Sequence, residues 1–259
     1  MHCIVTAGGL PGPEDPLYPY TQGKPKALLD MGGRTMLERV MDALQNSKYV
    51  ETIVLVGLEG DMGMQFKRPI DKYLPDHGSL VGNVLAGVNW LREEYPDMKS
   101  VLFSTSDLPA LTAANVDSFV EICEPFDKGV YYIFVPKEKM EARFPGSKRT
   151  YTKLKGAEIA GGDIAIAQVD LADEHKELWI ALTDARKHAW KLARIVGLRT
   201  LLKLLFRRLS IADIEELASK LIDRPAKIVL NAPAEMAMDV DKPGQVDLLR
   251  ADLQAEQNA

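Results

Sequence analysis

Apolar runs alternate with amphipathic segments through the first half of the chain. Runs typical of buried strands cover residues 3–6, 51–56, 100–104 and 130–135. Apolar side chains recur at helical spacing in residues 35–45, 80–94 and 112–123. Strands that alternate with helices are typical of α/β proteins, in which helices cover both faces of a sheet. The pattern therefore predicts an α/β fold with a mostly parallel sheet, whose ligands bind beyond the carboxyl ends of the strands.

The second half of the chain contains weaker strand signals. An apolar stretch at residues 157–169 predicts a strand or a hairpin, because Gly161-Gly162 interrupts it. Two shorter apolar runs, at residues 227–230 and 236–240, predict strands near the end of the chain. A last helix is expected to begin at Pro243, since proline suits the first helical turn.

The segment between these strands has a mostly helical pattern from residue 173 to residue 222. The pattern breaks near Gly197 and starts again at Ser210, whose hydroxyl suits a helix N-cap. The length and the hydrophobic content of the chain are sufficient for one large core. We expect a single domain over residues 1–259, in which residues 173–224 form a helical insertion or cover.

Composition narrows the classes of protein to consider. The chain has a formal net charge of −5 and no long run of one charge sign, which argues against a general nucleic-acid-binding protein. Cys3 and Cys123 are too far apart in sequence for a metal motif, so a reducing cytoplasm is the expected location. No apolar run reaches the length of about 18 residues that a membrane span needs, and no signal-peptide pattern is present.

The most informative motif follows the first predicted strand. Ala7-Gly8-Gly9 forms a glycine turn, and Lys24-Pro25-Lys26 precedes the next apolar run. Glycines let backbone N–H groups approach an anion closely and lysines add positive charge, so the motif is a candidate polyphosphate site. Prolines after the turn exclude the immediate helix of a dinucleotide-binding loop. An open loop around a triphosphate, with Lys26 reaching in, is the remaining binding interpretation; an ordinary turn with two solvated lysines is the alternative.

These motifs, followed by Gly32-Gly33-Arg34 and a helix, resemble the opening of the MobA-like nucleotidyltransferases. The resemblance covers the first half of the chain well and the extreme C-terminus moderately, and it is poor from residue 138 to residue 224. It implies a Rossmann-like fold of the GT-A type, with a helical insertion in the second half and a bound NTP. By the same resemblance, the nucleotide-binding residues of the loop are Ala7, Gly8, Gly9, Lys24 and Lys26, and Lys26 is also catalytic.

One departure from the family pattern lies in the loop itself. The family usually carries an arginine shortly after the glycines, whereas this chain has the acidic pair Glu14-Asp15 and no arginine in that stretch. Two carboxylates that pointed inward would repel a triphosphate. Lys24 is the candidate replacement for the missing positive charge.

Two aspartates are candidate ligands of Mg²⁺. Asp107 follows the predicted strand at residues 100–104, and carboxylate oxygens are ligands that Mg²⁺ prefers. The resemblance places a metal-binding and catalytic aspartate at Asp107 and a second metal-binding aspartate at Asp241, ahead of Pro243. Asp239 is the weaker choice for the second position. The alternatives are a turn residue at Asp107 and a helix N-cap at Asp241.

A segment of small residues opens the helix at residues 80–94 and is a candidate base-binding site. The family contacts the nucleotide base with a similar segment, which implies roles for Gly78, Ser79, Leu80 and Asn83; Ser79 stands where proline is usual. Small residues let a flat ring lie against the backbone, although Asn83 equally suits a hydrogen bond to the backbone. The choice between GTP and CTP stays open.

Two further segments have weaker assignments. Gly161-Gly162-Asp163, with Lys153 and Lys155, is a candidate for the acceptor side of the site. Residues 185–209 contain eight Lys or Arg residues and no Asp or Glu. This basic segment is interpreted as a cover over an anionic acceptor, a homodimer contact, a peripheral contact with an anionic membrane, or a solvated basic face over a core stripe of leucines.

Together these features predict a Mg²⁺-dependent nucleotidyltransferase. Such an enzyme transfers an NMP from an NTP to a small phosphorylated acceptor and releases pyrophosphate. Asp239-Val240-Asp241 also has the Asp-x-Asp form, so a glycosyltransferase that uses a nucleotide sugar is the first alternative. A non-catalytic nucleotide-binding protein is the second, because the loop arginine is absent.

Overall fold

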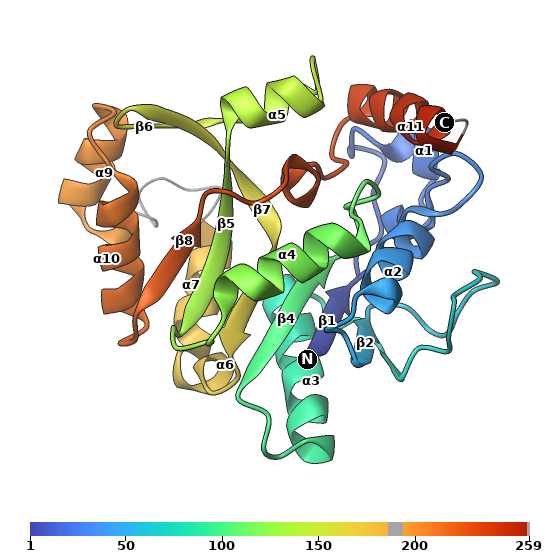
Figure 1. Ribbon diagram of the computed structural model, residues 1–259, viewed down its shortest axis with the longest axis horizontal. Coiled ribbons are helices and arrows are strands. Elements are labelled where there is room, and N and C mark those ends of the chain that lie inside the picture. Colours follow the sequence, from blue (N-terminus) through green and yellow to red (C-terminus); the bar gives the residue numbers. More distant parts are fainter. Residues whose placement is uncertain (186–193, 258–259) are drawn as a thin grey trace.

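A mixed sheet forms the centre of the molecule (Figure 1). Eight strands belong to it among residues 1–185 and 194–257, which the computed structural model describes. The strands are β1 (His2–Thr6), β2 (Thr52–Val56), β3 (Lys72–Leu74), β4 (Ser100–Thr105), β5 (Val130–Pro136), β6 (Thr152–Leu154), β7 (Ala157–Gln168) and β8 (Ala226–Val229). Their order is β3-β2-β1-β4-β7-β5-β8, with β6 paired to β7. The predicted α/β fold of the Rossmann-like type is confirmed.

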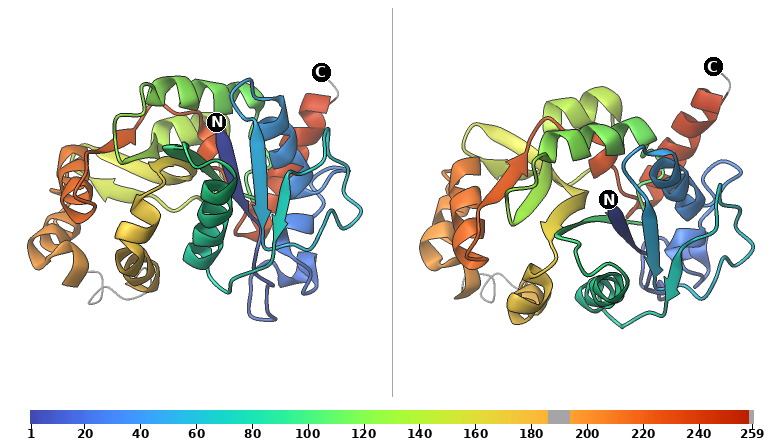
Figure 2. Two further views of the ribbon diagram at one scale, coloured as in Figure 1. Left: turned by 90° about the horizontal axis from the view of Figure 1, so that it is seen from below. Right: turned by 60° about the horizontal axis from the view of Figure 1, so that its bottom comes forward.

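Helices cover both faces of this sheet. Along the described residues, the helices include α1 (Tyr18–Thr21), α2 (Met36–Asn46), α3 (Leu80–Glu94), α4 (Ala113–Cys123), α5 (Lys137–Arg143), α6 (Leu171–Glu174), α7 (Lys176–Ala185), α9 (Leu198–Leu205), α10 (Ile211–Leu221) and α11 (Pro243–Gln257). The described residues also contain two 3₁₀ turns: η1 (Lys26–Leu28) precedes α2, and η2 (Ala234–Ala237) precedes α11. Figure 2 shows α2 and α4 on one face of the sheet and α3, α6 and α7 on the other.

Local signals explain the helices of the first half. Thr35 caps α2 and Thr112 caps α4 through reciprocal capping boxes, and the Ser79 hydroxyl accepts a hydrogen bond from Gly82 N at the start of α3. Each cap satisfies an N–H group that the first helical turn leaves without a partner. On β1, Cys3 and Val5 face the α2 and α4 side, whereas Ile4 packs against α3. The core therefore has two layers, one on each face of the sheet.

Two strand predictions differ from the structure. Gly161-Gly162 does not interrupt the apolar stretch, because β7 runs through both residues and absorbs the irregularity as a register shift against β5. A Cβ atom at Gly162 would lie 2.9 Å from the Cβ of Ile133, so glycine fits the close approach there. Residues 236–240 are not a strand; η2 and an extended segment replace it, and the apolar side chains are buried without a ladder.

The segment between β7 and β8 is helical where it is described, through α6, α7, α9 and α10. Its residues 186–193, part of the basic segment, lie outside the described residues. Gly197 and Ser210 are the N-caps of α9 and α10, so the break and the new start are confirmed. None of the described helices combines the length and the hydropathy that a membrane-crossing helix needs.

We expect Gly57→Ala to destabilise the protein by about 3 kcal/mol or more, because two effects add there. Gly57 has φ of +111°, and a Cβ atom would lie 2.2 Å from the backbone nitrogen of Gly8. Gly60 also has a positive φ, +80°, but its Cβ would meet nothing within 4 Å. Gly60→Ala is therefore the control and should cost only about 1–2 kcal/mol of backbone strain. Urea unfolding measures both, and equal losses would contradict the close approach.

Candidate active site

The carboxyl ends of β1 and β4 bring the predicted site residues together. The Lys26 ammonium donates one hydrogen bond of 2.8 Å to Asp107 Oδ2 and another of 2.8 Å to Asp241 Oδ1. These three residues are far apart in sequence, so their convergence is a property of the fold. Burial lowers the pKa of Lys26, but the two carboxylates outweigh it and raise the pKa above its usual value. The lysine is therefore charged at neutral pH.

Hydrogen bonds from neighbouring residues hold Asp107 and the Asp241 segment in place. Lys26 is the first residue of η1, and Asp107 lies two residues beyond the end of β4, where Thr105 Oγ1 donates to its carboxylate at 2.5 Å. The backbone nitrogen of Val240 donates to the Asp107 carbonyl at 3.2 Å, which ties the C-terminal segment to β4. Gln245 Oε1 accepts from the backbone nitrogen of Asp241 at 2.9 Å. Gln245 is fully buried and is a positioning residue that sequence reasoning missed.

The carboxylates form a cluster that suits a hard cation. One oxygen of each of Asp107, Asp239 and Asp241 lies within 4.8 Å of the others. Burial raises the pKa of Asp241, but the Lys26 ammonium outweighs it and the net pKa is lowered, so this carboxylate is ionised at neutral pH. Oxygen donors at this spacing fit Mg²⁺, which prefers carboxylates and phosphate oxygens. Asp107 and Asp241 meet the geometric requirement for sharing one ion.

Two further ionisable residues lie at this cluster, Arg149 and Asp163. Arg149 forms an ion pair with Asp239, and its Nη2 lies 3.9 Å from Asp163 Oδ2. Burial and the charges of Asp107 and Asp241, opposed by Arg149, raise the pKa of Asp163 to about 7. Among the described residues, Asp163 Oδ2 is a buried oxygen without a hydrogen-bond donor. The excess of carboxylates over cations favours the binding of a positive ion.

No motif in the sequence indicated a role for Arg149. It lies between α5 and β6, where the resemblance is poor, and only the fold brings it to Asp239. Of the residues assigned to the acceptor side, Asp163 lies near the cluster, whereas Lys153 pairs with Glu158 on the hairpin of β6 and β7. Asp239 is buried and paired with Arg149, whereas Asp241 is exposed and shares the Lys26 ammonium with Asp107, so Asp241 remains the better candidate for the second metal ligand.

We expect Arg149→Met to destabilise the fold by about 3–5 kcal/mol, since it leaves the Asp239 carboxylate buried without its partner. Adding Asp239→Asn should recover part of the loss, because the uncompensated charge disappears. Arg92→Met breaks the exposed pair with Asp173 and is the matched control, with an expected cost below about 1 kcal/mol. Chemical unfolding measures the three variants. A loss at Arg149 no larger than that of the control would contradict this account of the ion pair.

The glycine turn follows β1, whose neighbour in the sheet, β4, leads to Asp107. Ala7 N donates to Val56 O at 2.8 Å, and Ser106 N donates to Thr6 O at 3.0 Å, so the end of β1 is held between its two neighbouring strands. Gly8 packs so closely that a Cβ atom would lie 2.6 Å from Asn83 Nδ2, whereas the space at Gly9 is open. Gly8 therefore packs against the start of α3, while the bond from Ser106 N keeps the last residue of β1 next to the segment that carries Asp107. Its role in phosphate binding stays a prediction.

The candidate base-binding residues have two different environments. Asn83 is buried; its Oδ1 accepts from His77 N at 2.7 Å and its Nδ2 donates to Asp76 Oδ1 at 2.9 Å. These bonds favour the alternative in which Asn83 holds the backbone rather than a base. Gly78, Ser79 and Leu80 are exposed, and they stand at the N-terminal end of α3. Contact of these three residues with a base stays a prediction.

A known protein family matches most of this chain. Residues 21–221 match the family described as the MobA-like NTP transferase domain. The chain belongs to this family. The match includes residues 138–221, where sequence inspection found little resemblance, and it ends before Asp241. The family resemblance predicted from the glycine and lysine motifs is confirmed.

Solved structures agree with this membership in the MobA-like family. A hypothetical transferase from Thermus thermophilus is 33% identical, with a TM-score of 0.81 over 95% of this chain and 98% of the other. A 2-C-methyl-D-erythritol 4-phosphate cytidylyltransferase, also from Thermus thermophilus, is 16% identical, with a TM-score of 0.54 over 98% of each chain. A CMP:2-keto-3-deoxy-manno-octonic acid synthetase complexed with CTP is 11% identical, with a TM-score of 0.58 over 98% of each chain. The last two share the fold with this chain.

The departure from the MobA-like loop pattern also has a structural basis. The Asp15 carboxylate accepts a hydrogen bond of 2.8 Å from Leu17 N in the turn before α1, and Glu14 is exposed. Asp15 therefore serves the local turn, which reduces its effect on a phosphate. Lys24 is exposed beyond the same helix, and its proposed replacement of the family arginine stays a prediction.

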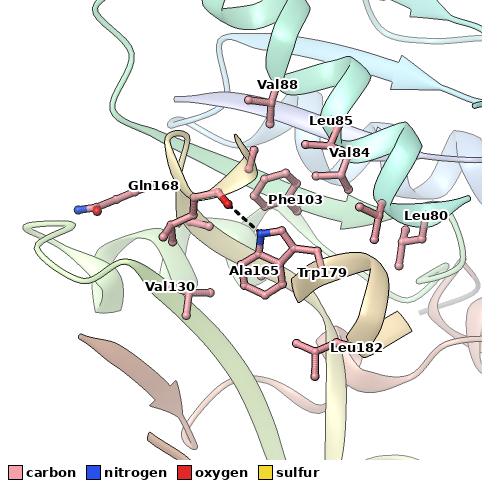
Figure 3. Close-up of a pocket in the computed structure, with 14 residues that line it drawn as sticks. Leu80, Val84, Leu85, Val88, Phe103, Val130, Ala165, Gln168, Trp179 and Leu182 are labelled. Atoms are coloured by element: carbon pink, nitrogen blue, oxygen red, sulfur yellow. Dashed lines mark hydrogen bonds between the residues drawn. The ribbon is translucent and has the colours of Figure 1, made fainter. Parts of the chain in front are cut away.

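An apolar cavity of about 270 Å³ lies between α3, α6, α7 and the sheet (Figure 3). Phe103, Ala165 and Ala167 form its floor on β4 and β7, and the small alanines leave the space open. Trp179 closes one side and donates from Nε1 to Leu171 O at 2.8 Å. Leu80, next to the candidate base-binding residues, lines the cavity as well. Sequence reasoning missed this cavity, because alanines on a strand give no specific signal.

Proposed function

We propose that this MobA-like protein transfers an NMP from an NTP, with GTP and CTP as the candidates, to a small phosphorylated acceptor. Pyrophosphate is the second product. The proposal depends on one observation, the convergence of Lys26, Asp107 and Asp241 at the carboxyl ends of β1 and β4. Cytidylyltransferases with the same fold support an NTP donor. We treat residues 1–259 as one domain, with residues 173–224 as its helical insertion.

The residues have distinct parts in the proposed reaction. Backbone N–H groups of the turn bind the phosphates, and Lys26 donates to the oxygens around the α-phosphorus. Asp107 and Asp241 would hold Mg²⁺, which when bound supplies positive charge against the phosphate oxygens. An oxygen of the acceptor phosphate attacks the α-phosphorus in line. The new P–O bond forms as the bond to pyrophosphate breaks.

The proposed chemistry needs no protein nucleophile or general base, because an ionised phosphate is already nucleophilic at neutral pH. Rate enhancement would come from positioning the two phosphates and from cations that meet the developing charge. The polar contacts from Thr105 and Gln245 contribute by holding Asp107 and the Asp241 segment in place.

Thermal-shift measurements with the four ribonucleotides, with and without Mg²⁺, are the first test of the proposal. We expect one NTP to raise the melting temperature in a Mg²⁺-dependent manner, and pyrophosphate to be released only when a phosphorylated acceptor is added. Transfer from a nucleotide sugar without pyrophosphate would contradict the proposal in favour of a glycosyltransferase. Mg²⁺-dependent stabilisation without pyrophosphate across the acceptor panel would favour a non-catalytic binding protein.

A further inference from the structure

Helix α9 presents an apolar stripe to solvent. Leu198, Leu202 and Leu205 follow the i, i+4, i+7 spacing of one helix face, and Phe206 extends it. Their exposed fractions are 65%, 43%, 72% and 66%, in that order. The interpretation of the leucines of this segment as a core stripe is therefore wrong for these three, whereas Leu201 is partly buried and Leu209 is buried. Exposed apolar residues gathered in this way are typical of a surface that binds another protein or a membrane.

The opposite side of α9 is already packed. Leu204 and the buried Leu209 contact the small cluster around Leu154 and Ile159 of the β6 and β7 hairpin. Lys203 Nζ donates to Asp213 Oδ1 of α10 at 2.6 Å. These contacts fix the orientation of the helix, so the apolar stripe cannot turn inward without breaking them.

Basic side chains lie beside the apolar stripe. Arg199, Arg207 and Arg208 are exposed, and Arg199 and Arg208 line a shallow groove together with three of the apolar side chains, Leu198, Leu202 and Phe206. The sequence from 185 to 209 has no acidic residue, although the whole chain has a net charge of −5. Among the described residues of this segment, exposed positive charge therefore lies next to the apolar stripe of an acidic protein. An apolar surface with basic side chains beside it complements a lipid bilayer with anionic headgroups.

We propose that α9 docks this protein on an anionic membrane surface. The leucines and Phe206 enter the boundary between headgroups and acyl chains, while the arginines contact lipid phosphates. The helix lies in the plane of the interface, because its eight residues are too short to cross a bilayer. The inference goes beyond the proposed function and does not depend on it, since membrane docking needs no bound nucleotide.

Co-sedimentation of the full chain with vesicles tests the inference. We expect binding to vesicles of phosphatidylglycerol and phosphatidylcholine at low salt, weaker binding at high salt, and little binding to phosphatidylcholine alone. Leu202→Gln with Leu205→Gln should weaken the binding by about tenfold or more, since two apolar side chains no longer leave water. Arg207→Gln with Arg208→Gln should weaken it by about tenfold, and only on the anionic vesicles.

A matched control separates docking from general surface hydrophobicity. Ile122 is 46% exposed on α4, and Ile122→Gln should leave vesicle binding unchanged. Thermal unfolding of all variants should match that of the unmodified protein, because the altered side chains are exposed. Failure of the unmodified protein to bind the anionic vesicles would overturn the inference. A concentration-dependent dimer in light scattering that the leucine variants abolish, with vesicle binding unaffected, would overturn it in favour of a second copy on α9.

Discussion

Asp107→Asn is expected to lower kcat for nucleotidyl transfer by at least about a hundredfold, because the variant loses a negative ligand at the centre of the cluster. The amide keeps the size of the side chain and one acceptor oxygen, but its NH2 group cannot accept, so only one of the hydrogen bonds from Lys26 and Thr105 is kept as it is. Mg²⁺-dependent NTP binding should weaken as well, because Asp107 is one of two carboxylates proposed to hold the ion. Pyrophosphate release with the donor and acceptor found in the panel measures the first effect, and calorimetry measures the second.

Asp97→Asn is the control for this substitution, since Asp97 is an exposed aspartate in the turn after α3. It should leave both turnover and NTP affinity unchanged. Turnover of the Asp107 variant within about threefold of the unmodified protein would exclude the assigned role, given the losses that removal of one such contact usually causes.

Lys26→Ala is expected to reduce turnover by about a hundredfold or more. It should also change the affinity for the divalent cation and the affinity for the NTP in different ways. Without ligand, the Lys26 ammonium bridges Asp107 and Asp241 and offsets part of their negative charge, so its removal leaves two carboxylates without a bridging cation. Divalent-cation affinity should therefore stay the same or rise, whereas NTP affinity falls. Asp107→Asn should lower both affinities, which distinguishes the lysine from the carboxylate.

Lys26→Arg is the conservative variant for this test. It keeps the positive charge but changes the geometry, so partial recovery of NTP affinity with low turnover is expected. Unchanged turnover in Lys26→Ala would refute the role of this residue. A parallel loss of cation and NTP affinity would show that Lys26 supports the shape of the site rather than the phosphate.

Local signals made the first half of the fold predictable. The capping residues Thr35, Ser79 and Thr112 stand directly before their helices, and the buried strands are short and strongly apolar. The antiparallel direction of β7 had no such signal. Strand direction depends on how far the chain travels between strands, and a long irregular segment does not fix that distance.

The candidate site also contains residues that the sequence indicated and residues that it did not. Lys26, Asp107 and Asp241 were assigned because each belongs to a short motif, next to a strand or helix end, that resembles the family pattern. Arg149 and Gln245 act through partners distant in sequence, so no local pattern indicates them. The orientation of α9 was also unpredictable, since the leucine spacing specifies a face of the helix but does not say whether that face is buried.

The central claim is that Lys26, Asp107 and Asp241 bind a magnesium-complexed triphosphate. Calorimetric titration of CTP and of GTP, with Mg²⁺ and with a chelator, tests it most directly. We expect one of the two nucleotides to bind at a single site, and its affinity to fall by at least about tenfold both in the chelator and in Asp241→Asn. Affinity that is unchanged by the chelator and by the Asp241 variant, or no binding of either nucleotide, would contradict the account.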